Sequence, residues 1–170
     1  GYLVGDFVRD KDGVSACAMV AEVIAYYKTK GKNVFQVLAE IYSQFGFYKE
    51  SLISVTKKGK DGAEQIQKLM ADFRTNPPKE MNGSAVVKVV DVKNSTITHV
   101  QTGQVEKLDM DKSNVMQFYL ADGSKISARP SGTEPKIKYY FSVNTPISDP
   151  TDYRKVEAKL VEKLEGLKAY

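Results

Sequence analysis

The sequence predicts an α+β fold, with helices packed on one face of a mostly antiparallel sheet. From Ser84 onward apolar side chains recur at every second residue in several short stretches, which is typical of strands with one buried face. Turn signals separate these stretches: Asn82-Gly83, Thr102-Gly103 and, most strongly, Asp122-Gly123. Segments with helical apolar periodicity lie before and after the strands, so sheet and helices are expected to share one core.

The N-terminal part of the chain is predicted to form two helices. Val14–Tyr27 is apolar on nearly every side, which predicts a helix buried by several neighbours, with Asp12 as its N-cap. Cys17 lies in this segment and is expected to be a buried structural thiol. Asn33 and Gln36 form a capping pair for a second helix that ends at Gly46.

The composition changes after this helix, so we place a domain boundary there, with domains at 1–46 and 47–170. The second domain begins with a strand at 48–57, followed by a helix that Asp61 and Glu64 are predicted to cap and that Asn76-Pro77-Pro78 ends. Further strand-like stretches are 84–92, 96–100, 104–108, 116–120, 125–129 and 136–143. Asp149-Pro150 starts a last helix with one apolar stripe, giving the order β-α-β-β-β-α or close to it.

Composition and charge restrict the function. The chain has 170 residues, 42% of them hydrophobic, and no apolar run long enough to cross a membrane. It begins without Met or a signal-peptide pattern, so we expect a piece of a longer cytoplasmic protein with a reduced cysteine. The net charge of +4 comes from scattered lysines and fits a small anionic ligand at least as well as nucleic acid.

The stretch Arg129–Lys138 has the chemistry of a phosphate-binding loop between two strands. Arg129 offers a bidentate guanidinium, Ser131 and Thr133 offer hydroxyls, and Gly132 lets the backbone approach a ligand closely. An ordinary connecting turn is the alternative, because Pro, Ser and Gly are common in turns.

This loop, Arg-Pro-Ser-Gly-Thr-Glu-Pro-Lys-Ile-Lys, resembles the phosphate-binding loop in the fourth domain of the α-D-phosphohexomutases, the phosphoglucomutase/phosphomannomutase family. Gly1-Tyr2-Leu3 followed by Arg9–Gly13 resembles the end of the family's third domain. The resemblance implies that 1–46 is the remnant of the α/β sugar-binding third domain. It also implies that 47–170 is the C-terminal phosphate-binding domain.

The family resemblance further implies phosphoryl transfer between the 1- and 6-positions of a hexose phosphate. It places a phosphoserine in the first domain, Mg²⁺ in the second, and a hexose 1,6-bisphosphate as activator. The fourth-domain loop holds the phosphate that does not react, so Arg129, Ser131, Gly132 and Thr133 are the expected phosphate contacts. Lys136 and Lys138 alternate on the following strand and are expected to add positive charge.

Lys11 is a tentative catalytic residue by the same resemblance, placed near the transferring phosphate. It precedes the mouth of a helix, where the dipole and free amides favour an anion. The alternative is a surface lysine paired with Asp10 or Asp12.

The family's catalytic serine, metal loop and sugar-binding loop are not in this sequence. The fragment is therefore expected to be inactive alone and to bind neither Mg²⁺ nor the activator. The sequence does not indicate which sugar phosphate the parent protein uses. Asp10 with Asp12 and Asp109 with Asp111 lack the further converging oxygens that a hard cation needs. His99 is expected to be a solvated strand residue.

Two other functions compete with the enzyme fragment. One is a non-catalytic phosphosugar- or anion-binding module, and the other is a basic domain that binds RNA or DNA. The expected partners are a phosphorylated hexose and the remaining domains of the parent chain, with no membrane.

Overall fold

The structure, a computed structural model, describes residues 3–57 and 59–169, without the side chain of Lys60. It divides into two compact units, each treated by itself. The first comprises Gly1–Gly46 and Pro146–Tyr153, and the second comprises Phe47–Thr145 and Arg154–Tyr170. No helix in the described part of the chain is long and apolar enough to cross a membrane.

The first unit contains helices α1 (Gly13–Thr29) and α2 (Val34–Phe45) and the 3₁₀ turn η1 (Pro150–Asp152). The predicted caps of both long helices are confirmed. The Asp12 carboxylate accepts a hydrogen bond from the Val14 amide at 2.9 Å, and Asn33 forms a capping box with Gln36. These side chains satisfy amides that the first helical turn leaves free.

The prediction that α1 is a buried helix is wrong for the described unit, in which no α1 residue is buried. Val14 is 82% exposed, and Cys17 is an exposed thiol and not the buried one predicted. The reason is tertiary: the apolar faces are present, but no described element of this unit covers them. In α2 only Val37 and Ala39 are buried, and Phe35 is 76% exposed.

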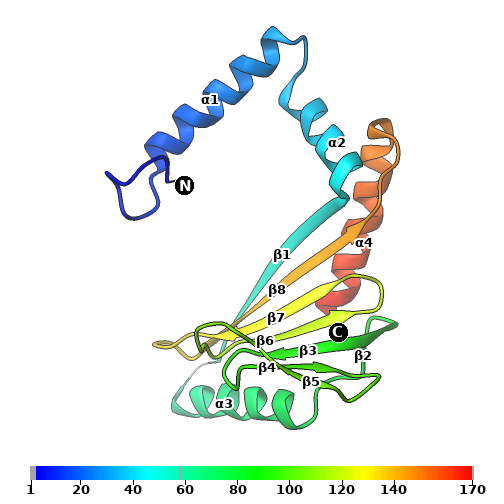
Figure 1. Cartoon of the computed structure of the whole chain (residues 1–170). Helices are drawn as coiled ribbons and strands as arrows, with labels where there is room; N and C mark the ends of the chain where they lie inside the picture. Colours follow the sequence, from blue (N-terminus) through cyan, green and yellow to red (C-terminus); the bar gives the residue numbers. More distant parts are fainter. Residues whose placement is uncertain (1–2, 58, 170) are drawn as a thin grey trace. The chain divides into compact units, whose positions relative to one another are not determined.

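The second unit is built on one eight-stranded sheet in which every pairing is antiparallel (Figure 1). Seven strands follow the order β1-β8-β7-β6-β3-β4-β5, and β2 pairs with β3 alone. The strands are β1 (Phe47–Thr56), β2 (Glu80–Met81), β3 (Ser84–Asp91), β4 (Thr96–His99), β5 (Val105–Lys107), β6 (Met116–Leu120), β7 (Lys125–Pro130) and β8 (Lys136–Thr145).

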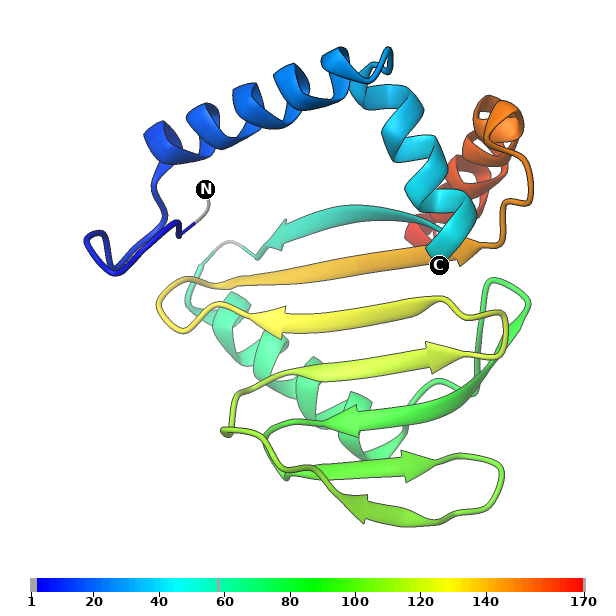
Figure 2. The same cartoon turned by 45° about the horizontal axis from the view of Figure 1, so that its top comes forward.

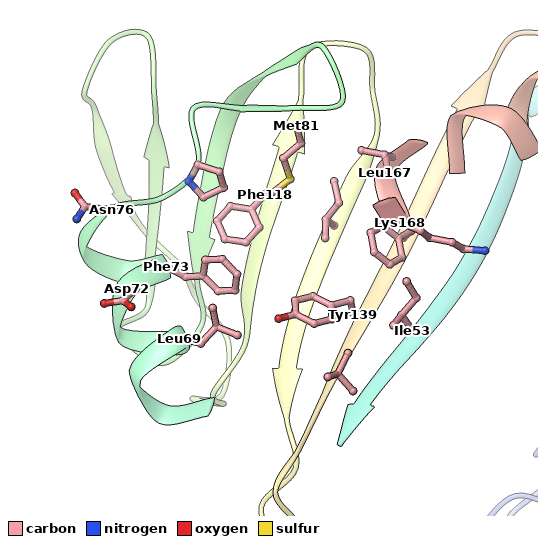
Figure 3. A pocket seen from close by; sticks show the side chains of 14 residues that line it. Ile53, Leu69, Asp72, Phe73, Asn76, Met81, Phe118, Tyr139, Leu167 and Lys168 are labelled. Carbon is pink, nitrogen blue, oxygen red and sulfur yellow. The ribbon is translucent and has the colours of Figure 1, made fainter. Parts of the chain in front are cut away.

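Helices α3 (Lys60–Thr75) and α4 (Tyr153–Ala169) lie on the same face of this sheet, which Figure 2 shows from its other side. The predicted α+β class is confirmed. The seven predicted strand stretches correspond to β1 and to β3 through β8, so the short form β-α-β-β-β-α contains too few strands, and β2 was not predicted. A largely apolar cavity of about 520 Å³ separates the two helices over the sheet (Figure 3). Phe118, Ile126 and Leu167 are buried residues of its lining.

The start of α3 differs from the prediction. Asp61 and Glu64 do not cap it, because the helix begins at Lys60 and its N-cap is Gly59, which has no side chain to accept a hydrogen bond. Asp61 lies instead in the first turn, where a negative charge favours the helix dipole. The predicted stop is confirmed, since Asn76 is the C-cap.

Asp122, in the turn between β6 and β7, connects that turn to α4 through an ion pair with Lys163 at 2.8 Å. Burial acts to raise the pKa of Asp122, but hydrogen bonds from Lys163 and Ser124 outweigh it and hold the pKa below its usual value. The carboxylate is thus kept charged at the point where the hairpin contacts the helix.

A buried ion pair connects α3 to the far half of the sheet. The Arg74 Nε donates to Asp91 Oδ2 at 3.1 Å, and the two side chains are only 17% and 10% exposed. Arg74 also donates to the Met70 carbonyl and to Asn114, while Asp91 accepts from the amides of the turn that follows β3. Each partner therefore has the further hydrogen bonds that a buried charge requires.

Arg74→Ala is expected to lower the free energy of unfolding by about 3 kcal/mol, because Asp91 would be left buried without its counter-charge. Urea denaturation followed by circular dichroism measures the loss. Arg154→Ala is the matched control, since Arg154 is exposed and forms no ion pair with another described residue. Equal losses in the two variants would contradict this account of the Arg74–Asp91 pair.

Candidate phosphate-binding loop

The stretch between β7 and β8 turns tightly at the end of a long antiparallel pair. Arg129 lies opposite Lys138 and Pro130 opposite Ile137, so the two strands remain paired up to the loop. The Ser131 amide donates to the Lys136 carbonyl at 2.8 Å and closes the turn. Alternation then places the side chains of Arg129 and Lys138 on the same face of the sheet.

Ser131 organises the turn from inside. Its hydroxyl oxygen accepts from the amides of Thr133 and Glu134 at 3.4 and 3.3 Å. The Lys57 amide, just after β1, donates to the Pro135 carbonyl at 2.8 Å and connects the turn to the neighbouring strand. The loop is thus fixed by hydrogen bonds of its own, which reduces the entropy that a ligand would have to remove on binding.

A hollow of about 210 Å³ opens beside this turn. Its lining consists of Arg129, Pro130, Ser131, Gly132, Glu134, Lys136, Lys138 and Tyr140. No ion pair within 4.0 Å joins its three cations to an acidic group among the described residues. With three positive side chains and one carboxylate, the hollow carries a net positive charge, which favours an anion.

The structure brings three of the four predicted contact residues to this hollow. Arg129, Ser131 and Gly132 line it, whereas Thr133 is exposed and is not part of the lining. Lys136 and Lys138 also line it. Tyr140, which sequence analysis did not single out, is the next residue of the same alternation, and that period is the signal by which it could have been found.

Gly132 has room around it. Its backbone is not in the left-handed region, and a Cβ added to it would meet no protein atom within 4 Å. The turn therefore does not need glycine for its own conformation. What glycine leaves is free space on the exposed side of the loop.

Lys11, the tentative catalytic residue, belongs to the first unit. Its ammonium donates to Asp10 at 2.7 Å, and both side chains are about four-fifths exposed (80% and 82%). Hydrogen bonds from the Lys11 side chain and amide lower the pKa of Asp10. The described geometry is that of a surface ion pair at the N-terminus of α1.

The remaining candidate groups do not assemble into a site. No group of three or more His, Cys, Asp or Glu side chains among the described residues could hold a metal ion. His99 lies on β4 with its Nε2 3.1 Å from the Glu106 carboxylate, and its side chain is 38% exposed.

Comparisons of the chain with known proteins identify related sequences. The chain is 36% identical over 149 residues to a phosphoglucomutase of Staphylococcus aureus (strain N315), an alignment that covers 88% of this chain and 27% of the relative. The phosphoglucomutase of strain MSSA476 is 36% identical over 143 residues, covering 84% of this chain and 26% of the relative. The chain belongs to the phosphohexomutase family.

This phosphohexomutase chain spans about a quarter of the length of the curated relatives that it matches (27%). Among solved structures, parafusin, a phosphoglucomutase from Paramecium in its open form, has a TM-score of 0.45 and 18% identity over 92% of this chain and 26% of its own. No model of a known protein family matches the chain. The family assignment rests on the sequence relatives.

Gly132→Ala tests whether a ligand approaches the loop backbone in this phosphohexomutase chain. The melting temperature is expected to stay within about 1 °C of the wild type, since the new methyl meets no protein atom. Phosphate affinity, measured from amide shifts, is expected to fall at least threefold because the methyl would occupy ligand space. Unchanged affinity would show that the ligand does not approach Gly132.

Proposed function

We propose that the chain is the C-terminal part of a phosphoglucomutase or phosphomannomutase and that its loop holds the phosphate that is not being transferred. The observation that supports this is the hollow at Arg129, Lys136 and Lys138, where three cations that form no ion pair with another described residue lie beside a preformed turn. On this proposal residues 1–46 are the remnant of the third domain and 47–170 the fourth.

The role of the loop is to bind and orient. Arg129 would contact two phosphate oxygens with its planar guanidinium, and Ser131 and Thr133 would offer hydroxyls. Binding energy from this remote group would position the other end of the sugar for reaction. Lys11 is proposed to assist proton transfer near the reacting phosphate, which requires that a substrate displace its contact with Asp10.

The chemistry itself is proposed to lie in the rest of the parent protein. In phosphohexomutases a phosphoserine donates the phosphoryl group, and Mg²⁺ supplies charge stabilisation when bound. The described residues contain no acidic cluster that fits this metal. We propose, from the family resemblance, that the parent protein binds Mg²⁺ and a hexose 1,6-bisphosphate activator and acts in the cytoplasm.

Arg129→Gln is expected to weaken the binding of hexose 6-phosphate about tenfold or more, because it removes a charge-assisted pair of hydrogen bonds. Amide shifts of ¹⁵N-labelled chain measure binding, and the wild-type shifts should centre on Ser131, Gly132 and Thr133. The matched control is Arg154→Gln, on α4, which should bind like the wild type. If these three amides stay still while others move, the phosphate site is elsewhere.

The isolated chain is expected to show no interconversion of hexose 1- and 6-phosphates. The proposal places the phosphoserine and the metal loop outside it, so no group in the chain can donate the phosphoryl. A coupled assay for hexose 6-phosphate formed from hexose 1-phosphate measures this, with a complete phosphoglucomutase as positive control. Turnover proportional to chain concentration, and abolished by Arg129→Gln, would contradict the assignment.

A further inference from the structure

The cavity between α3 and α4 has no part in the proposed function. Its volume of about 520 Å³ lies in the range of roughly 300–1,000 Å³ that small-molecule sites occupy. The described residues that line it are all different from those beside the phosphate loop. Along β8, Tyr139 and Phe141 line the cavity, and Lys138 and Tyr140 line the loop hollow, so the two lie on opposite faces of the sheet, the helix face and the open face.

Ion pairs attach both helix walls of the cavity to the sheet. The buried pair described above connects α3 to β3. On α4, Lys163 pairs with Asp122 in the turn between β6 and β7, and Glu157 pairs with Lys49 on β1, each at 2.8 Å. The two helices are thus attached to different parts of the sheet, and moving them together would break at least one of these contacts. The cavity is therefore a built part of this unit.

Aromatic side chains make up much of the lining. Phe73 of α3 packs edge to face on Phe118 of β6, with ring centroids 5.4 Å apart and 68° between the ring planes. Tyr139 and Phe141 contribute two further rings from β8 (Figure 3). Aromatic rings offer flat apolar contact, and their electron-rich faces attract a cation. The lining therefore suits a flat apolar ring that carries a positive charge.

The Tyr139 hydroxyl is a polar group inside this apolar lining. Figure 3 shows it pointing across the sheet toward α3, on the side of Leu69. No hydrogen bond connects it to another described residue. Burial of the half-buried side chain raises the pKa of Tyr139. The hydroxyl is thus available to a ligand group that donates or accepts a hydrogen bond.

The charge of the lining is asymmetric. Its two charged residues are Asp72 on α3 and Lys168 on α4. The Lys168 ammonium pairs with Glu165 at 2.8 Å and points away from the cavity (Figure 3). Asp72 lies exposed at the outer end of the α3 wall and forms no ion pair with another described residue. A positive group is therefore favoured on the α3 side, toward which the Tyr139 hydroxyl also points.

We propose that the cavity between α3 and α4 binds a small aromatic amine. The ring lies among Phe118, Ile126 and Leu167, all of them buried, and the ammonium lies beside the Tyr139 hydroxyl and Asp72. A pure hydrocarbon would leave the hydroxyl without a partner, and an anion would be repelled by the carboxylate. The proposal does not depend on the phosphate loop.

The test uses three indoles that share one ring: tryptamine, a cation; tryptophol, which is neutral; and indole-3-acetate, an anion. The chain contains no Trp, so the fluorescence of a bound indole can be followed directly. The full chain is expected to bind tryptamine about threefold more tightly than tryptophol, with indole-3-acetate the weakest. Asp72→Asn should remove the advantage of tryptamine and leave tryptophol unchanged. Glu64→Gln, an exposed carboxylate on α3 outside the lining, is the matched control.

Two further variants locate the bound ring. Tyr139→Phe should weaken tryptamine and tryptophol about fivefold, because it removes one hydrogen bond. Ile53→Phe should abolish binding, since the larger side chain fills the cavity from β1. Leu52→Phe is its matched control: Leu52 is 50% exposed and projects from the opposite face of the same strand. Circular dichroism checks that each variant is folded.

Amide shifts of the ¹⁵N-labelled wild-type chain give a second readout that needs no variant. Tryptamine should shift the amides of Leu69, Phe73 and Leu167 and leave Ser131–Thr133 in place. Shifts confined to α1 would put the ligand on the exposed apolar residues of that helix and would overturn the proposal.

The fluorescence titrations have equally definite outcomes. No change of emission with tryptamine, or undiminished binding to the folded cavity-filling variant, would show that the cavity is not the site. Equal affinity for the three indoles, or equal effects of the two α3 carboxylate variants, would overturn the choice of an amine. None of these results would affect the phosphate loop, whose failure is read from its own amides.

Discussion

The antiparallel pairing of β7 with β8 is the constraint on which the candidate site depends. It places Arg129 beside Lys138, and it brings the chain back within the five residues between the two strands. A shift of one residue in this register would turn the alternate side chains of a strand to the other face. The buried helix-side residues Ile126, Ile137 and Phe141 oppose such a shift, because it would expose them. Hydrophobic burial on one face thus fixes the cations on the other.

One face of the sheet contributes to stability, and the other carries the candidate binding site. On the helix face, α3 and α4 cover apolar side chains, and Arg74 with Asp91 connects the helix to the distant strands. On the open face the same strands present lysine, serine and tyrosine. The hollow at Arg129, Lys136 and Lys138 lies on this face, where its charges are available to a ligand.

Local signals predicted most of the second unit. The turns at Asn82-Gly83 and Asp122-Gly123 require or favour particular backbone angles, and Gly83 and Gly123 indeed have positive φ. The phosphate-type loop was also visible, since it is contiguous in sequence. The exposure of α1 in the first unit could not be predicted, because an apolar helix has the same sequence whether or not a neighbour covers it. Tyr140 was missed as a residue of the hollow, although the alternation that passes through Lys136 and Lys138 leads to it.

On the proposed function, the distribution of charge at the loop between β7 and β8 argues that this loop binds the substrate and does not itself react. Arg129, Lys136 and Lys138 are cations that stabilise an anion in every state of a reaction, and none forms an ion pair with an acidic group among the described residues. Uniform binding of that kind lowers the free energy of substrate and transition state alike. It accelerates a reaction only where another part of the protein holds the opposite end of the substrate against reacting groups. A preformed loop held between two strands suits that role. If the bound phosphate could move, the reacting end of the sugar would be displaced from the groups that act on it.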